Sequence, residues 1–152
     1  MNRAPELGKL ATGVPEMDFE HGLQIGLIEA FQSAVAGGGG EAPGRILERL
    51  MDFTNAHFLA EQLMMRLHNY PDYEGHVQEH DRLVDALKTL QQHLASGALE
   101  LSGQAAERLQ EWLLGHLQSQ DQALATFLKK PRSGQAAPGS RNTDAPAFPG
   151  VE

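Results

Sequence analysis

The sequence contains no cysteine among its 152 residues. This absence excludes disulfide bonds, thiolate zinc sites, iron–sulfur clusters and cysteine nucleophiles. A metal site, if the protein has one, must therefore be built from histidine and carboxylate side chains.

Basic residues are scarce as well, because 12 Lys and Arg stand against 20 Asp and Glu, for a formal net charge of −8. Binding to nucleic acid or to an anionic membrane surface needs clustered basic side chains, so we expect neither partner. No stretch approaches the roughly 18 apolar residues of a membrane span, and no segment resembles a signal peptide. We expect a cytoplasmic protein that does not insert into a membrane.

What the sequence does have is helical periodicity, in four blocks at about 18–36, 44–68, 73–95 and 103–128. The glycine run 37–40, the turn 69–72 and the Ser96-Gly97 pair separate the blocks, and Ser102 is expected to cap the last one. Four amphipathic helices with short connections predict an all-α fold, an up-down-up-down antiparallel four-helix bundle.

The length suits one domain. We expect residues 1–17, with Pro5 and Pro15, to form an N-terminal arm and residues 18–130 to form the bundle. Residues 131–152 are rich in proline, glycine and alanine and poor in aromatic residues, which predicts a disordered tail. This tail is a candidate tether for a protein partner, whereas the sequence leaves the oligomeric state open.

Polar residues interrupt the apolar stripes of all four helices. Two pairs have i,i+4 spacing, which puts both members on one helical face a single turn apart, where they can ligate the same metal or adjacent metals. Without partners, these buried groups would cost several kcal/mol for each ionised one. The full set is His21, His57, Glu61, His76, His80, His116 and Asp121.

Asp121 fits this pattern least well. It follows His116 by five residues, which is about 140° around a regular helix rather than the same face. Asp121 therefore needs either a flanking position beside the other ligands or a local π-bulge, of the kind found at functional sites.

The seven residues in this order resemble the ligand set of the hemerythrins, most closely the bacterial ones. Two flanking segments are similar to the family as well, the acidic approach Asp18-Phe19-Glu20-His21 and the segment Trp112-Leu113-x-x-His116. The resemblance covers about residues 12–128.

The resemblance implies two non-haem iron ions with a bridging oxo or hydroxo group. It places His76, His80 and His116 on one iron and His21 and His57 on the other, with Glu61 and Asp121 bridging. The second iron then has one position open for dioxygen. Leu113, Trp112 and Phe58 are candidates for the O2 pocket.

The implied function is reversible O2 binding as a carrier, a store or a local supply, rather than enzymatic catalysis. An O2 or redox sensor acting through a partner is an alternative. A zinc hydrolase is a second alternative, because His76-Val77-Gln78-Glu79-His80 fits the H-x-x-E-H string with Glu79 as general base. That interpretation leaves the other candidate ligands without a purpose.

Two glycines close to His21 and two histidines outside the set of seven carry further expectations. Gly22 and Gly26 remove side chains beside His21, which predicts easier solvent access to the second iron and faster autoxidation. His68 continues the stripe of Glu61 but is expected near the bundle end, and His93 is expected outside the site.

Overall fold

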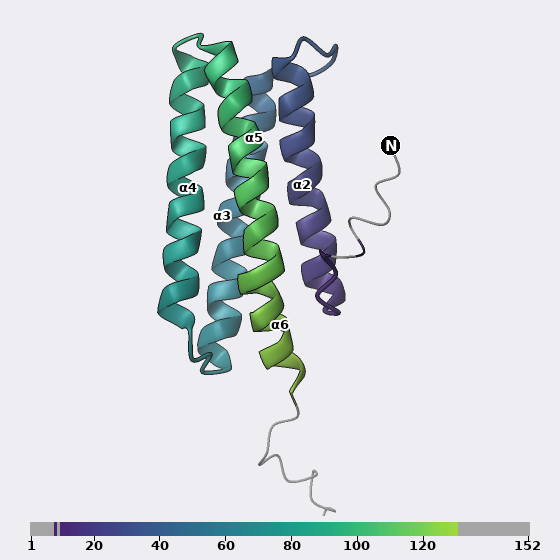
Figure 1. Cartoon of the computed structure of the whole chain (residues 1–152), viewed down its shortest axis with the longest axis vertical. Coiled ribbons are helices and arrows are strands. Elements are labelled where there is room, and N and C mark those ends of the chain that lie inside the picture. Colours follow the sequence, from purple (N-terminus) through teal and green to yellow (C-terminus); the bar gives the residue numbers. More distant parts are fainter. Residues whose placement is uncertain (1–7, 9, 131–152) are drawn as a thin grey trace, which may run out of the picture.

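The computed structural model describes residue 8 and residues 10–130, which contain helices and no strand. Four long helices stand side by side and alternate in direction (Figure 1). They are α2 (Pro15–Val35), α3 (Pro43–Leu67), α4 (Tyr73–Ala95) and a continuous fourth helix made of α5 (Leu99–His116), the π-helical η1 (Leu117–Asp121) and α6 (Gln122–Lys129). The predicted all-α antiparallel bundle is confirmed.

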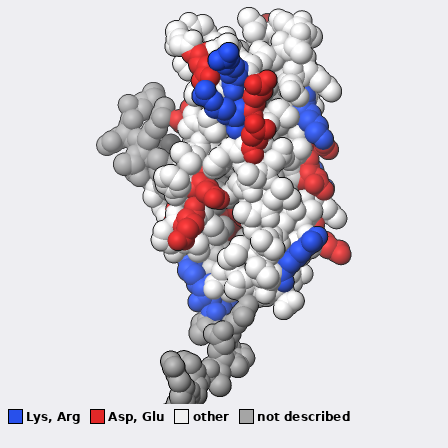
Figure 2. Space-filling model, turned by 180° about the vertical axis from the view of Figure 1, so that it is seen from behind, with Lys and Arg blue, Asp and Glu red and all other residues white. Residues whose placement is uncertain are grey.

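The helices close into a ring, because α2 contacts α3, α3 contacts α4, α4 contacts α5 and α5 contacts α2. Within the described residues, no helix is long and apolar enough to cross a membrane. On the face shown in Figure 2, the described Lys and Arg side chains lie beside Asp and Glu and do not form a continuous basic patch. The tail 131–152 and residues 1–7 and 9 of the arm lie outside the described residues.

The first helix begins three residues earlier than the sequence predicts. α2 starts at Pro15, with Glu16 and Asp18 in its first turn. Proline suits the first turn of a helix because no backbone N–H is needed there, and acidic side chains are favourable beside the N-terminal end of the helix dipole. Pro15 is therefore the start of the helix rather than part of the arm.

The prediction that Ser102 caps the last helix is wrong. α5 begins at Leu99, and Ser102 lies inside it, fully buried, with its hydroxyl donating to the carbonyl of Ala98 at 3.0 Å. A serine inside a helix satisfies its hydroxyl by bonding back to the carbonyl four residues earlier. The capping preference of serine therefore does not mark the start of this helix.

Two apolar clusters fill the bundle, and a layer of buried histidine and carboxylate side chains lies between them. The larger one includes Phe31, Leu50 and Leu87 and occupies the end where α2 joins α3 and α4 joins α5. The smaller one is built around Met17, Met65, Leu124 and Ala125, near the turn between α3 and α4. Burial of both clusters aligns the four helices and fixes the height at which the polar layer lies.

Candidate metal centre

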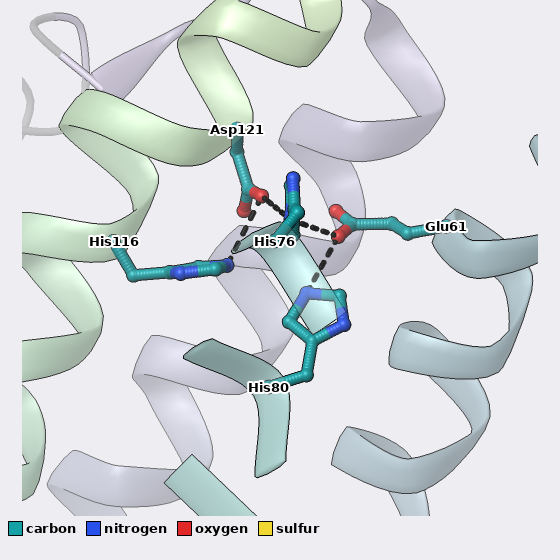
Figure 3. A group of neighbouring side chains, drawn as sticks. All are labelled: Glu61, His76, His80, His116 and Asp121. Atoms are coloured by element: carbon teal, nitrogen blue, oxygen red, sulfur yellow. Dashed lines mark ion pairs between the residues drawn. The ribbon is translucent and has the colours of Figure 1, made fainter. Parts of the chain in front are cut away.

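The structure brings all seven candidate ligands together in one layer across the bundle. Each of them is at most 4 % exposed. Figure 3 shows five of them pointing toward one another from α3, α4 and the fourth helix. The layer consists of His21 on α2, His57 and Glu61 on α3, His76 and His80 on α4, His116 on α5 and Asp121 on η1.

Glu61 lies between the two groups of histidines. Its Oε2 is 3.2 Å from Nε2 of His76 and 3.1 Å from Nε2 of His80. Its Oε1 is 3.1 Å from Nε2 of His57 and 3.6 Å from Nε2 of His21. The two oxygens of this carboxylate therefore face opposite groups.

Asp121 repeats this arrangement from the fourth helix. Its Oδ1 is 3.0 Å from Nε2 of His76 and 3.1 Å from Nε2 of His116, whereas its Oδ2 is 2.9 Å from Nε2 of His21. Both carboxylates thus offer one oxygen to each group of histidines. This is the arrangement expected of two bridging carboxylates.

Two overlapping ligand groups follow from these distances, and in each the ligand atoms lie within 4.8 Å of one another. The first group offers three imidazole nitrogens and the second offers two, and both use the same two carboxylates. Their members are Glu61, His76, His80, His116 and Asp121 in the first, and His21, His57, Glu61 and Asp121 in the second.

A π-helical turn explains how Asp121 reaches the site. The segment Leu117–Asp121 is π-helical and directly follows His116, the last residue of α5. A π turn adds a residue to the repeat, so that positions five apart point the same way. Of the two alternatives that the sequence left open for Asp121, the structure contains the π-bulge.

The residues fit a cation, as their unpartnered atoms show. The Nε2 atoms of all five histidines and the four oxygens of Glu61 and Asp121 are buried without a hydrogen-bond partner, although the nitrogen–oxygen distances are short. Contacts this short without hydrogen-bond alignment leave the buried polar groups unsatisfied, which is costly. Metal ions placed between them would satisfy these atoms, and imidazole with carboxylate suits iron as well as zinc.

The ionisable side chains of the layer shift one another's pKa values. Burial alone would lower the pKa of His21 and of His76, but close contacts with Asp121 and Glu61 outweigh burial and raise both pKa values to about 9. Burial alone would raise the pKa of Glu61, yet the surrounding histidines hold it well below its usual range. The two negatively charged carboxylates are therefore stabilised by positive charge beside them, either protons on the histidines or bound metal ions.

Glu20 also belongs to the site, because it contacts the candidate ligand His57. The sequence alone marks Glu20 only as part of the acidic segment before His21. Its Oε2 lies 2.5 Å from Nδ1 of His57, and its side chain is 39 % exposed while that of His57 is buried. A carboxylate at the outer nitrogen of a ligating histidine fixes the ring and makes it a stronger ligand. The contact joins α2 to α3, so no spacing within one helix could have predicted it.

The three O2-pocket candidates lie in different surroundings. The ring of Phe58 stacks on His80, with centroids 3.7 Å apart and 3° between the planes. Leu113 is buried one turn from His116, whereas Trp112 donates from Nε1 to Glu79 at 3.2 Å. Their contact with dioxygen stays a prediction.

Glu79 does not take part in either ligand group. It accepts hydrogen bonds from Trp112 and, at 2.6 Å, from Arg82. A hydrolytic base must reach water on the metal, so this geometry does not favour the hydrolase alternative. His68 and His93 lie at the ends of α3 and α4, outside both groups.

Comparison with known proteins decides the family. Residues 12–128 match the family model described as the hemerythrin HHE cation binding domain. The chain belongs to the hemerythrin family. The predicted resemblance is thereby confirmed, and membership supports, in general terms, oxygen binding at an iron centre.

Individual relatives in the hemerythrin family are distant. The chain is 26% identical over 113 residues to a bacteriohemerythrin of Methylococcus capsulatus, and the alignment covers 74% of this chain and 86% of that protein. It is 24% identical over 120 residues to a bacteriohemerythrin of Stenotrophomonas maltophilia, covering 79% and 78%. No solved structure matches the chain.

Proposed function

We propose that the protein binds dioxygen reversibly at a di-iron centre and serves as an oxygen carrier, store or local supply rather than as an enzyme. The observation that carries this proposal is the pair of ligand groups that share both carboxylates but contain unequal numbers of histidines. The names of the bacteriohemerythrins to which the chain is similar agree with it.

The unequal groups assign different roles to the two halves of the site. His76, His80 and His116 would hold one iron with one oxygen from each carboxylate, and His21 and His57 would hold the other in the same way. One fewer nitrogen leaves the second position with room for an additional ligand. When bound, the two ferrous ions would supply the electrons that dioxygen accepts and recover them on its release.

The protein surrounds the proposed di-iron centre with apolar side chains and supplies mainly neutral imidazole ligands. Imidazoles coordinate as neutral groups, so a histidine-rich site adds little negative charge and does not strongly favour the oxidised metal. The apolar clusters on both sides of the layer keep bulk water away from it. Both features favour reversible binding over oxidation chemistry.

The test is the visible spectrum of anaerobically reduced, iron-loaded protein through cycles of oxygenation and deoxygenation. We expect an absorption that appears with dioxygen and disappears when dioxygen is removed. A spectrum that changes once and does not return would show an oxidase or a damaged centre and would contradict the proposal. The zinc-loaded protein, which has no accessible redox change, is the matched control.

A further inference from the structure

A small buried cavity lies in the layer next to the ligands, on the side of the larger apolar cluster. Four of its lining residues are Gln24, Thr54, Leu83 and Leu113, one from each helix of the bundle. Each lies three residues from a histidine of the metal layer, which is about 4.5 Å along a helix axis. The cavity therefore begins directly beside the candidate metal centre.

One wall of this cavity is polar. The amide Nε2 of Gln24 donates to Oγ1 of Thr54 at 2.9 Å, and both side chains are almost completely buried. The other lining residues are leucine and isoleucine. Since α2 and α3 are the helices that carry His21 and His57, the polar wall stands above the second ligand group.

The amide oxygen of Gln24 has no partner. Among the described residues, Gln24 Oε1 is a buried atom without a hydrogen bond. It lies outside the ligand groups, so a metal ion there does not account for it. Buried acceptors in folded proteins are satisfied either by protein groups or by ordered water, and this acceptor calls for a donor located in the cavity.

The size of the cavity indicates that the donor is a single water molecule. The volume of the cavity is about 10 Å³. A single water molecule needs roughly 10–15 Å³ by this measure and at least two polar partners. The cavity provides that volume for one molecule and no more, and Gln24 and Thr54 provide the two partners.

We propose that the cavity is the binding site of one water molecule, which donates to Gln24 Oε1 and is held by the hydroxyl of Thr54. The effect of this water molecule on autoxidation rests on the proposed function, oxygen binding at a di-iron centre. Irreversible oxidation of two ferrous ions by one dioxygen molecule consumes two protons and releases hydrogen peroxide. The two protons come from bulk solvent, and a water molecule at this place is one step by which they can reach the second ligand group, so it promotes autoxidation.

The experiment locates the water first, without relying on oxygen binding. High-resolution crystal structures of the full chain loaded with Zn²⁺ would be determined for the unmodified protein, Gln24→Leu and Thr54→Val. Gln32→Leu is the matched control, because Gln32 also lies on α2 and donates across the bundle, to Gln110 at 2.9 Å, but lines no part of this cavity. Water–protein cross-relaxation in solution provides the same information should a variant fail to crystallise.

We expect an ordered water within hydrogen-bonding distance of Gln24 Oε1 in the unmodified protein and in Gln32→Leu. It should be absent from Gln24→Leu and lost or displaced in Thr54→Val. A dry cavity in the unmodified protein, or a water that persists in Gln24→Leu, would overturn the proposal.

The second readout is the autoxidation rate of the iron-loaded, oxygenated protein. Gln24→Leu should autoxidise several-fold more slowly than the unmodified protein, and Gln32→Leu should match the unmodified protein. An unchanged rate in Gln24→Leu would overturn the role of the water in proton transfer. A chain that binds no dioxygen at all would instead contradict the proposed function, while the crystal structures would still decide the water site.

Discussion

The two halves of the candidate metal centre share the same carboxylates but differ in their number of imidazoles and in the group on their outer side. The half built on His76, His80 and His116 has three imidazoles, and the ring of Phe58 covers one of them. The half built on His21 and His57 has two imidazoles and an outer carboxylate that reaches solvent. The first half thus offers one imidazole more than the second, and only the second has a partly exposed carboxylate on its outer side. We therefore expect an added ligand to bind at the second half.

Removal of a shared carboxylate should abolish both halves at once. We expect Glu61→Ala to lose both metal ions and to be destabilised by about 3–5 kcal/mol, because buried histidines are left without their counter-charge. Metal analysis and thermal unfolding measure the two effects. Glu48→Ala, at an exposed position of the same helix, is the control. A Glu61→Ala protein that kept both metal and melting temperature would show that Glu61 is not a bridge.

Removal of one histidine should separate the halves. His57→Ala should keep one iron per chain and lose stable oxygen binding, since it removes one of only two imidazoles at the second half. His116→Ala should weaken the first half instead and leave two imidazoles there. Iron content and oxygen-dependent spectra check both variants. Oxygenated spectra that are unchanged in His57→Ala would contradict this assignment of the halves.

Without metal, the layer should be stable only over a limited pH range. His21 and His76, whose pKa values are raised to about 9, contribute stability that is complete below their ordinary value of 6.5 and is lost as pH rises through 9. Glu61, whose pKa is lowered, contributes stability above 4.5 that is lost as pH falls. Burial lowers the pKa of His80, which costs some stability below 6.5, but the larger shifts of the other groups should make the melting temperature of the metal-free full chain highest between about pH 4.5 and 6.5.

Metal ions should change the alkaline side of this profile, because coordination replaces the protons on the imidazoles. The metal-loaded protein should keep its melting temperature as pH rises from 6.5 to 9. A metal-free protein with a flat profile over this range would show that the histidines hold no extra protons.

Loss of the outer carboxylate should weaken the second half alone. Glu20→Gln removes the charge that holds Nδ1 of His57, and outer carboxylates of this kind are worth about tenfold to a hundredfold in metal affinity. Competition with a chelator should show the loss for one of the two ions. Glu16→Gln, on the same helix and exposed, should behave as the unmodified protein does, and equal losses in both variants would argue against a specific role of Glu20.

The smallest effect concerns solvent access beside His21. A surface cavity of about 130 Å³ is lined there by residues that include Asp18, His21 and Gly22. A Cβ atom at Gly22 would meet no heavy atom within 4 Å, so this position has open space for the first atom of a side chain. Gly22→Leu should therefore slow autoxidation modestly, as measured by the decay of the oxygenated spectrum. An unchanged rate would show that solvent does not reach the centre by this route.

Much of the site could be predicted because it depends on spacing within single helices. The pairs His57/Glu61 and His76/His80 occupy one face each by the 3.6-residue period alone. For Asp121 the five-residue spacing left two alternatives, a flanking position or a local π-helical turn, and the structure contains the turn.

Other features depend on contacts between helices and could not be predicted from one period. Glu20 reaches His57 and Gln24 reaches Thr54 only because α2 and α3 pack at one particular height. The helix ends were also less predictable: Pro15 begins α2, whereas Ser102, a common capping residue, lies inside α5. At Pro15 the preference of proline for the first turn agrees with the boundary, whereas at Ser102 the preference for a cap does not fix it.

The central claim is a centre of two unequal metal positions, and iron content combined with the Mössbauer spectrum of the oxygenated protein tests it most directly. We predict two irons per chain in two distinguishable environments of equal population, because one position is complete and the other carries the added ligand. A single iron per chain, or two irons that remain equivalent when oxygen is added, would contradict this account.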